Sequence, residues 1–346
     1  MRPRRERDAP AGSLIRKGSK IKAPRVAPAP ERAHLHRPCS WFTIALLIQL
    51  IRHIFERARV HGRPVLSCEF FPTKSEAGER VLFEQTIPAL RELHPDFCSV
   101  TYGAGGSTRE KTFAIVDRIQ REQQITAMAH LTCVNTTVEE IQATLEQARE
   151  LGIRNVLALR GDPPDGGTEF VKTAGGFEYS YELVRCIREL GEFSIGVAGF
   201  PEGHVACREG KHEDWHRLRA KIDHGADVVI TQFFFENRHY FECREFLASR
   251  GVTVPIVPGI LPVLSISQIT RFVALCGAEL PRPMLEELQR HGDDDQAVAE
   301  LGIEYATRQC EELLREGAPG LHFYTLNKAR STTAVVKNLA LERGAW

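Results

Sequence analysis

Several polar residues interrupt apolar, strand-like runs of this 346-residue sequence, and each is of a type that can carry chemistry. Glu69 lies in the run VLSCEF, where burial of a carboxylate predicts a raised pKa and the role of a general acid. Asp162 follows ALRG, Gln232 lies in ITQFFF, and His130 lies in AHLTC. Each residue also has a structural interpretation: an ion pair for the glutamate, a turn for the aspartate, and core hydrogen bonds for the glutamine and the histidine.

A glycine-rich segment at 101–108, TYGAGGST, follows one of these runs and precedes a helical stretch, as phosphate-binding loops do. It lacks the Gly-x-Gly-x-x-Gly spacing and the Gly-Lys-Ser/Thr ending, which excludes Rossmann and Walker loops. A local contact with a cofactor stays open. The sequence contains no acidic metal-binding loop, and we predict catalysis without a metal.

These residues belong to a strand–helix pattern that starts near residue 64. Eight runs rich in Val, Ile and Phe alternate with amphipathic stretches, which predicts a parallel sheet. The expected strands are residues 65–70, 97–102, 125–133, 155–161, 193–200, 228–235, 254–261 and 320–327, with a helical insertion at about 280–318. Eight units favour an α/β fold of the closed (β/α)8 TIM-barrel type over a doubly wound open sheet. Barrel enzymes carry their chemistry at the C-terminal ends of the strands, where the polar residues gather here.

Composition excludes some classes of protein. The 45 Lys and Arg residues balance 45 Asp and Glu residues, so nothing indicates binding to nucleic acid or to an acidic membrane. The nine cysteines are scattered singly, which indicates neither a zinc site nor a disulfide framework. Scattered thiols favour a cytoplasmic location.

Residues 1–62 differ from the rest and are expected to extend a catalytic barrel domain at 63–346. Residues 1–40 are rich in Arg, Pro and Ala without apolar periodicity, which predicts a disordered basic tail. The apolar run at 41–52 is shorter than the roughly 20 residues that span a membrane. We therefore favour a short helix packed on the domain, or sequence from a misplaced start, over a membrane or targeting role.

Seven segments resemble, in order, motifs of the methylenetetrahydrofolate reductase family in its short bacterial form. They are CEFFP (68–72), SVTYGAGG (99–106), AHLTC (129–133), ALRGDPP (158–164), ITQFFF (230–235), PGILPV (258–263) and HFYTLN (322–327). The resemblance implies a barrel that binds FAD non-covalently and takes hydride from NADH, which we favour, or NADPH. It further implies ping-pong reduction of 5,10-methylenetetrahydrofolate to 5-methyltetrahydrofolate for methionine synthesis, by a homo-oligomer.

The resemblance also assigns roles to individual residues. Glu69 matches the acid that helps to open the five-membered ring of the folate, Asp162 matches an aspartate beside the flavin pyrimidine, and Gln232 matches a glutamine that contacts folate and nicotinamide. The flavin-contacting positions are Thr101, Tyr102, Ala104, His130, Arg160, Gly161, Asp162, Tyr179, His204, Asp214 and Lys221, and the further substrate-contacting positions are Gln268, Phe272 and Lys328.

Some positions depart from the family pattern. Phe200 replaces a common tyrosine, and Arg217 and Ala220 differ from the polar pattern of the flavin-binding helix. Lys328 replaces an arginine, which loses the two-pronged hydrogen bond to the folate glutamate and predicts weaker folate binding. The chain ends soon after the eighth unit, so a C-terminal regulatory domain and inhibition by S-adenosylmethionine are not expected.

Three other functions compete with this interpretation. A pterin-binding barrel transferase would share the folate pocket but need no flavin, and the flavin-contacting set argues against it. Another flavin barrel, such as a proline dehydrogenase-like oxidoreductase, is disfavoured by the combination of Glu69 with Gln232. A catalytically inactive binding protein is disfavoured because the acid and Asp162 are both present.

Overall fold

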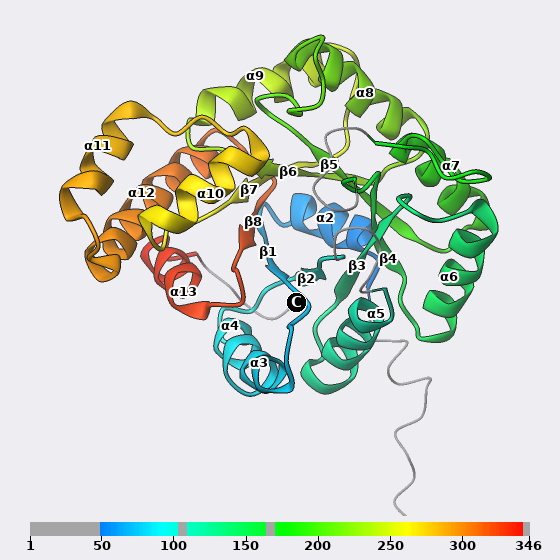
Figure 1. The fold of residues 1–346 in the computed structure, drawn as a ribbon, viewed down its shortest axis with the longest axis horizontal. Coiled ribbons are helices and arrows are strands. Elements are labelled where there is room, and N and C mark those ends of the chain that lie inside the picture. The colour runs from blue at the N-terminus through cyan, green and yellow to red at the C-terminus, as the bar shows by residue number, and fades with distance from the viewer. Residues whose placement is uncertain (1–48, 103–108, 164–169, 342–346) are drawn as a thin grey trace, which may run out of the picture. The chain divides into compact units, whose positions relative to one another are not determined.

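A computed structural model describes residues 49–102, 109–163 and 170–341. Its eight strands are all parallel, and they close into a barrel in which β8 pairs with β1 (Figure 1). The strands are β1 Val65–Phe70, β2 Phe97–Val100, β3 Ala127–Thr132, β4 Asn155–Leu159, β5 Ser194–Gly199, β6 Val228–Phe233, β7 Ile256–Ile260 and β8 Gly320–Tyr324. The predicted (β/α)8 barrel is therefore confirmed, and the open sheet is excluded. Several of the predicted strands are longer than the observed ones, because the predicted ranges include residues that belong to the following loops.

Helices follow the strands and surround the barrel (Figure 1). They are α2 Ile51–Val60, α3 Glu76–Val81, α4 Ile87–Arg91, α5 Arg109–Arg118, α6 Val138–Glu150, α7 Ser180–Leu190, α8 Lys211–Asp223, α9 Asn237–Ala248, α10 Ile266–Cys276, α11 Arg282–His291, α12 Asp295–Arg315 and α13 Ala329–Asn338, with π-helical turns η1 Leu82–Thr86 and η3 Ile119–Gln123. The predicted helical insertion is present as α11 and α12. None of the helices in the described ranges is long and apolar enough to cross a membrane.

Local sequence signals set where several helices begin. At α6, Thr137 and Glu140 form a reciprocal capping box, which satisfies two backbone N–H groups that the helix itself cannot pair. At α10, the side chain of Ser265 accepts a hydrogen bond from the backbone of Gln268. Such caps contribute about 1 kcal/mol each. The cap at Ser265 fixes the first turn of α10, which carries the predicted substrate-contacting residue Gln268.

Strand alternation divides the barrel into an outer and an inner layer. Outward side chains such as Leu66 and Phe70 pack with the surrounding helices in the main hydrophobic cluster. Inward positions on β1 are Val65, Ser67 and Glu69, because side chains alternate along a strand. The inner layer is apolar near the start of the strands and polar near their ends. The polar part of the inner layer is where the candidate site lies.

Helix α2 closes the end of the barrel where the strands begin, which we call the floor. Its buried residues Ile51, Ile54, Phe55 and Ala58 follow the i, i+3, i+4, i+7 pattern of an amphipathic helix and pack on inward residues of the strands. The backbone N–H of Ile51 donates to Asn155 Oδ1 at 2.9 Å. The sequence predicts a short helix in the apolar run 41–52, and the described helix α2 begins at the end of that run and covers Ile51–Val60. Residues 41–48 lie outside the described ranges. Helix α2, assigned from sequence to an extension, thus lies in the same compact unit as the barrel.

Candidate active site

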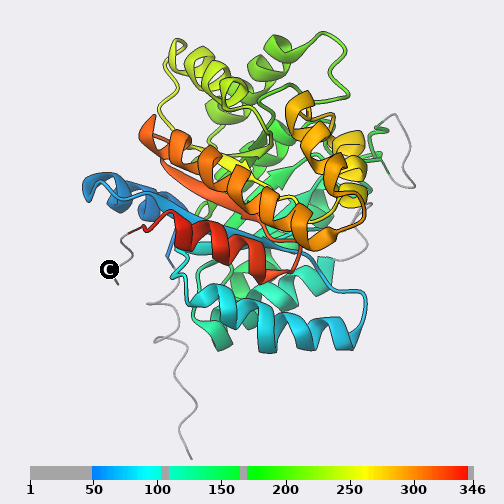
Figure 2. The ribbon, with the colours of Figure 1, turned by 90° about the vertical axis from the view of Figure 1, so that its left-hand side faces the viewer.

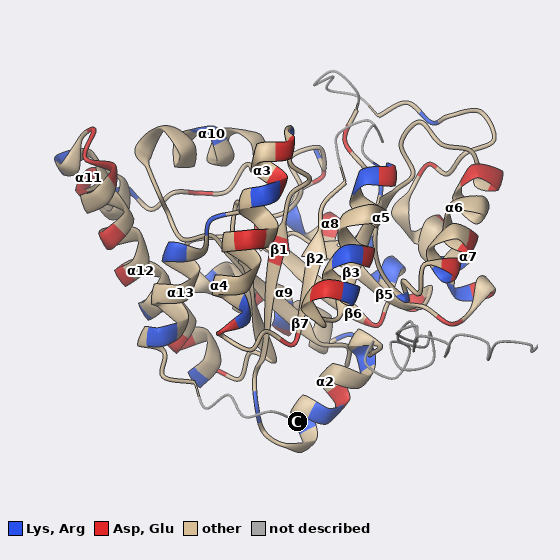
Figure 3. Ribbon diagram, turned by 90° about the horizontal axis from the view of Figure 1, so that it is seen from below, with Lys and Arg blue, Asp and Glu red and all other residues tan. Residues whose placement is uncertain are grey.

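The candidate site lies at the mouth, which we define as the end of the barrel where the strands finish. Helix α2 is at the opposite end from α10 and α11, as two perpendicular views show (Figures 2 and 3). The loops that follow β4 and β5 carry predicted site residues, and the inward residues of β1, β3, β6 and β8 lie beneath them. The mouth therefore collects residues that are far apart in the sequence.

Glu69 of β1 lies at the centre of a buried polar cluster. Its side-chain oxygen Oε2 accepts a hydrogen bond of 3.2 Å from the hydroxyl of Ser99 on β2. His130 Nε2 lies 3.3 Å away on β3, as an ion-pair contact without hydrogen-bond geometry, and His322 Nε2 lies 3.5 Å away on β8. Glu69 is only 5% exposed, so these three neighbours define its electrostatic environment.

The pKa of Glu69 departs from the sequence-based expectation. Burial raises the pKa of this carboxyl, but the close contacts with His130 and His322 lower it more, to about 2. The prediction of a raised pKa is therefore wrong for the protein without ligands. Its error was to count desolvation alone, since the sequence did not reveal that two imidazoles would flank the carboxylate. Glu69 is ionised at neutral pH in this state.

His322 was missed as a site residue by sequence reasoning. It is fully buried, and its Nδ1 lies 2.8 Å from the hydroxyl of Ser67, which also donates to the carbonyl of Leu321. In the β1–β8 register Ser67 faces His322 and Glu69 faces Tyr324. The available signal was the alternation of polar residues in both strands, because residues two apart share one face of a strand. Ser67, His322 and Glu69 thus form a continuous buried chain of polar groups.

Tyr324 covers the side of this cluster that faces β6 and β7. Its hydroxyl donates to the carbonyl of Thr231 at 2.7 Å, and burial, with a smaller effect of Glu69, raises its pKa well above the usual value. A Cβ atom on Gly259 would lie 2.6 Å from the Tyr324 ring and 2.2 Å from the Thr231 carbonyl oxygen. Glycine at position 259 is therefore required for this close packing, which explains its place in PGILPV.

A second group of charged residues surrounds the ends of β4 and β5. Arg160 and Asp162 follow β4, His204 follows β5, and Asp214 and Lys221 lie on α8. Burial lowers the pKa of Lys221 to about 8, Asp214 opposes this shift and Arg160 adds to it. Burial also lowers the pKa of His204, which interacts with the four other residues. The structure therefore brings together five of the predicted flavin-contacting residues.

Two polar atoms near this group are buried without a hydrogen-bond partner among the described residues. They are Oδ2 of Asp214 and Oγ1 of Thr132 at the end of β3. Burial raises the pKa of Asp214, while Lys221 and His204 lower it. Buried polar groups without partners are costly, so such atoms mark places where a ligand or water can bind. Together with two nearby cations they suit a ligand that has both anionic and hydrogen-bonding groups.

The turn after β4 has a backbone reason for its glycine. Gly161 has a φ of +88°, and a Cβ atom there would lie 2.7 Å from Cγ1 of Val134. Only glycine adopts this conformation in so little space. The preceding Arg160 lies with its guanidinium 4.9 Å from the ring centre of Phe170. Asp162 is exposed, so it can meet a ligand at the mouth.

The other predicted flavin-contacting residues do not all lie in one place. Thr101 and Tyr102 directly follow β2, and the Tyr102 hydroxyl accepts a hydrogen bond of 2.7 Å from Arg109. Ala104 lies outside the described residues. Tyr179 precedes α7, is 41% exposed and stacks on Tyr181 at 5.6 Å. Its charged neighbours are Glu178 and Arg217 of α8.

The predicted substrate contacts lie on the β6–β8 side of the mouth. Gln232 lines a small hollow together with Phe200 and Cys276, and its Oε1 accepts a hydrogen bond from the backbone of Phe233. Gln268 lies in the first turn of α10, and Phe272 of the same helix packs on the apolar cluster below. Lys328 is exposed immediately before α13.

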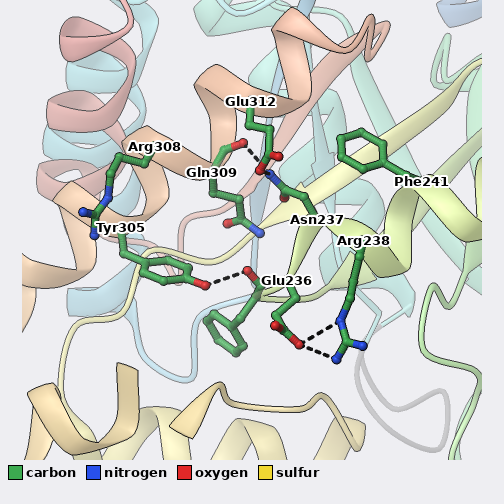
Figure 4. A pocket seen from close by; sticks show the side chains of 9 residues that line it. Glu236, Asn237, Arg238, Phe241, Tyr305, Arg308, Gln309 and Glu312 are labelled. Carbon is green, nitrogen blue, oxygen red and sulfur yellow. Dashed lines mark hydrogen bonds and ion pairs between the residues drawn. The ribbon is translucent and has the colours of Figure 1, made fainter. Parts of the chain in front are cut away.

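A larger cavity of about 430 Å³ lies outside this region, between the start of α9 and α12 (Figure 4). The hydroxyl of Tyr305 donates to the carbonyl of Phe235 at 2.8 Å, and Asn237 donates to Glu312 at 2.7 Å. None of the predicted site residues lines it. The size of this cavity therefore does not make it the candidate active site. The mouth is the candidate because of the chemistry of its residues.

The closed eight-strand barrel carries a buried carboxylate and a set of cations at its mouth. These features assign the protein to the class of (β/α)8 barrels with a ligand site at the C-terminal face. Residues 53–340 match the methylenetetrahydrofolate reductase family, and the chain belongs to that family. This confirms the resemblance noted in the sequence.

Individual relatives agree with the family assignment. The chain is 40% identical over 294 residues to methylenetetrahydrofolate reductase (NADH) 1 of Arabidopsis thaliana, covering 81% of this chain and 49% of that protein. It is 35% identical over 288 residues to 5,10-methylenetetrahydrofolate reductase of Escherichia coli, covering 83% and 94%. The chain thus spans about half the length of the plant relatives and nearly all of the bacterial one.

A solved structure supports the fold alone. An uncharacterized protein from Clostridium thermocellum, described as binding two copies of 5-methyl-5,6,7,8-tetrahydrofolic acid, matches with a TM-score of 0.56 and 13% identity. The match covers 82% of this chain and 97% of that one.

Proposed function

We propose that this protein reduces 5,10-methylenetetrahydrofolate to 5-methyltetrahydrofolate with FAD and a nicotinamide nucleotide, and so supplies methyl groups for methionine synthesis. The observation that carries the proposal is Glu69, a carboxylate held inside the mouth between His130 and His322. A family fold alone does not define an activity, but a buried acid–base cluster open to a ligand site supports one.

The residues around β4, β5 and α8 fit FAD. Arg160 and Lys221 would face its diphosphate, because guanidinium and ammonium groups are the side chains that bind phosphate. The unpartnered oxygens of Asp214 and Thr132 would meet hydroxyl and N–H groups of the cofactor. Asp162 would lie at the edge of the flavin ring. When bound, FAD would supply the hydride carrier that links the two substrates, in a ping-pong sequence.

The protein's own residues would handle the proton. Opening the five-membered ring of the folate requires a proton at the departing ring nitrogen, and Glu69 is the acid proposed to deliver it. Because its pKa is held near 2 without ligands, this carboxylate would be reprotonated through the imidazoles that contact it.

The opposite side of the mouth would bind the substrates. Gln232 would contact both folate and nicotinamide in turn, Gln268 and Phe272 on α10 would line the folate side, and Lys328 would meet the folate glutamate tail. NADH is the favoured donor, as the name of the Arabidopsis relative states for that protein. A homo-oligomer and a cytoplasmic location remain predictions.

An anaerobic visible spectrum of the purified protein tests the proposal. A flavin band that bleaches when NADH is added and returns when 5,10-methylenetetrahydrofolate follows would support both half-reactions. Bleaching without recovery would remove the folate substrate from the proposal. Failure to bind added FAD would favour the pterin-binding transferase instead.

A further inference from the structure

A cluster of acidic residues with one histidine lies at the rim of the mouth and has no role in the proposed reaction. Glu202 follows β5, His239 lies in the first turn of α9, and Glu279 lies between α10 and α11. One ligand atom from each residue can be chosen so that all three atoms lie within 4.8 Å of one another. Residues from three separate segments therefore converge on one small volume.

His239 is the observation that points to a ligand. It is only 8% exposed, and neither of its ring nitrogens makes a hydrogen bond with any described residue. Its Nε2 lies 3.6 Å from Glu202 Oε1 and 3.8 Å from Glu279 Oε2. Ligand atoms around a tetrahedral zinc ion are about 3.3 Å apart, so small side-chain movements would bring these atoms to coordination distance.

The charges of the cluster are not balanced by the described residues around it. Glu236 Oε2 also lies 3.8 Å from His239 Nε2, and Arg238 bonds to Glu236 at 2.6 Å and approaches Glu279 at 3.7 Å. Three carboxylates against one guanidinium leave two negative charges beside the imidazole. Burial raises the pKa of Glu202, and the neighbouring carboxylates of Glu279 and Glu236 act in the same direction, although the backbone N–H of Glu279 opposes them. A divalent cation would neutralise the excess charge.

We propose that Glu202, His239 and Glu279 bind a divalent first-row transition-metal ion of the Zn²⁺ type. An imidazole nitrogen with two carboxylate oxygens suits such ions better than Mg²⁺ or Ca²⁺, which prefer oxygen ligands alone. Burial lowers the pKa of His239, with Arg238 and Lys211 adding to the effect and Glu236 and Glu242 opposing it.

An ion bound at this position would have a structural effect. The backbone N–H of Glu279 already donates to Glu202 at 2.9 Å, which joins the segment after β5 to the end of α10. A shared metal would strengthen this link between the segment that carries His204 and the helix that carries Phe272. The ion would thus connect the cofactor side of the mouth to its substrate side without entering the reaction. The inference is independent of the proposed function.

Titration of the full, tag-free protein with Co²⁺ tests the proposal, because bound Co²⁺ absorbs visible light and Zn²⁺ should displace it. We expect one saturable site without the intense near-ultraviolet band of cobalt–thiolate bonds. Glu279→Gln and His239→Ala should each weaken Co²⁺ binding by more than about tenfold. Glu286→Gln and His291→Ala, on the neighbouring helix α11, are the matched controls and should bind like the wild type.

The outcomes are decisive in either direction. No saturable absorption in the wild type, a thiolate band, or unchanged affinity in the two ligand variants would overturn the proposal. Glu279 is well exposed, with 63% of its side chain accessible, so its variant should fold even if the His239 variant does not. Zn²⁺ should also raise the melting temperature of the wild type and of both controls, but not that of Glu279→Gln.

Discussion

The two ends of the barrel are built from the same strands but use polar residues in opposite ways. At the floor, Asp227 accepts hydrogen bonds of 2.8 Å from Arg188 and from the backbone of Ile195, and Asn155 pairs with the start of α2. At the mouth, Asp214, Thr132 and His130 each have a buried polar atom without a hydrogen-bond partner among the described residues. Asp227 and Asn155 are thus partnered in ways that hold the fold, whereas the three atoms at the mouth can bind a ligand.

The difference teaches that burial alone does not identify a functional polar residue. Ser194 and Asn155 at the floor are fully buried, as is His322 near the mouth. Ser194 and Asn155 accept hydrogen bonds from the backbone of α2, while His322 faces a second ionisable side chain, Glu69. A buried carboxylate flanked by imidazoles therefore marks the mouth, whereas exposure alone does not.

The largest expected effect is on catalysis at the mouth. Glu69→Gln removes the proposed proton donor, so reoxidation of the reduced flavin by 5,10-methylenetetrahydrofolate should slow by about 10²–10⁴-fold. Reduction of the flavin by NADH should be nearly unchanged, because that step needs no proton from Glu69. Stopped-flow absorbance can follow each half-reaction separately. An equal loss in both half-reactions would show that Glu69 supports the site rather than donates the proton.

The complementary change at the floor should affect stability and not chemistry. Phe55→Ala removes a ring that is 6% exposed and packs edge-on to Phe97 at 6.3 Å. The free energy of unfolding should fall by about 3–5 kcal/mol, from lost burial and the cavity left behind. Denaturant unfolding measures this loss, with the exposed residue change Glu56→Ala as the control. A fall in kcat/KM for folate at temperatures where Phe55→Ala is folded would contradict the division between the two ends.

The free energy of unfolding should depend on pH through the carboxylate of Glu69 at the mouth. Because the pKa of Glu69 is about 2 when folded and 4.5 for the ordinary group, its ionisation stabilises the fold above pH 4.5. This contribution is lost as the pH falls from 4.5 towards 2, and its full size is on the order of 3 kcal/mol. Relative to Glu69→Gln, the flavin-free wild type should therefore lose stability in that window. Parallel unfolding free energies for the two proteins from pH 7 to pH 3 would mean that the histidines do not lower this pKa.

The smallest expected effect concerns the rim of the mouth. Lys328→Arg should lower the KM for folate by at most about fivefold, because an exposed ion pair contributes about 1 kcal/mol or less. Steady-state kinetics with varied folate measures the change, and Lys337→Arg, further along α13, serves as the control. An unchanged KM would remove Lys328 from the folate site.

Much of the fold was predictable from local patterns. Eight β-branched and aromatic runs separated by amphipathic stretches predict the eight strands of the barrel, and β1 was placed at its observed bounds. Helix α2 was not placed from the sequence, because the apolar run at 41–52 outweighed the weaker i, i+3, i+4, i+7 spacing of Ile51, Ile54, Phe55 and Ala58. The spacing could have located the helix, but the surface it covers exists only in the closed barrel.

The candidate site was predictable in part. Glu69, Arg160 and Lys221 were found because charged residues interrupt apolar runs or match family motifs. His322 was missed as a residue of the cluster, since the alternation of polar residues along β8 indicates an inward position but not which residues it contacts. The assignment of Tyr179 to the flavin contacts rests on the family resemblance alone and stays a prediction.

By itself, the sequence determined which residue types stand at the ends of the strands, because the alternation of side chains along a strand is a local property. Only the tertiary structure decided their chemical state. The pKa of Glu69 depends on His130 and His322, which reach it from two other strands after the barrel closes. Electrostatic interactions act through space over a few ångströms, whatever the separation along the chain. The convergence of Glu202, His239 and Glu279 from three segments has the same origin.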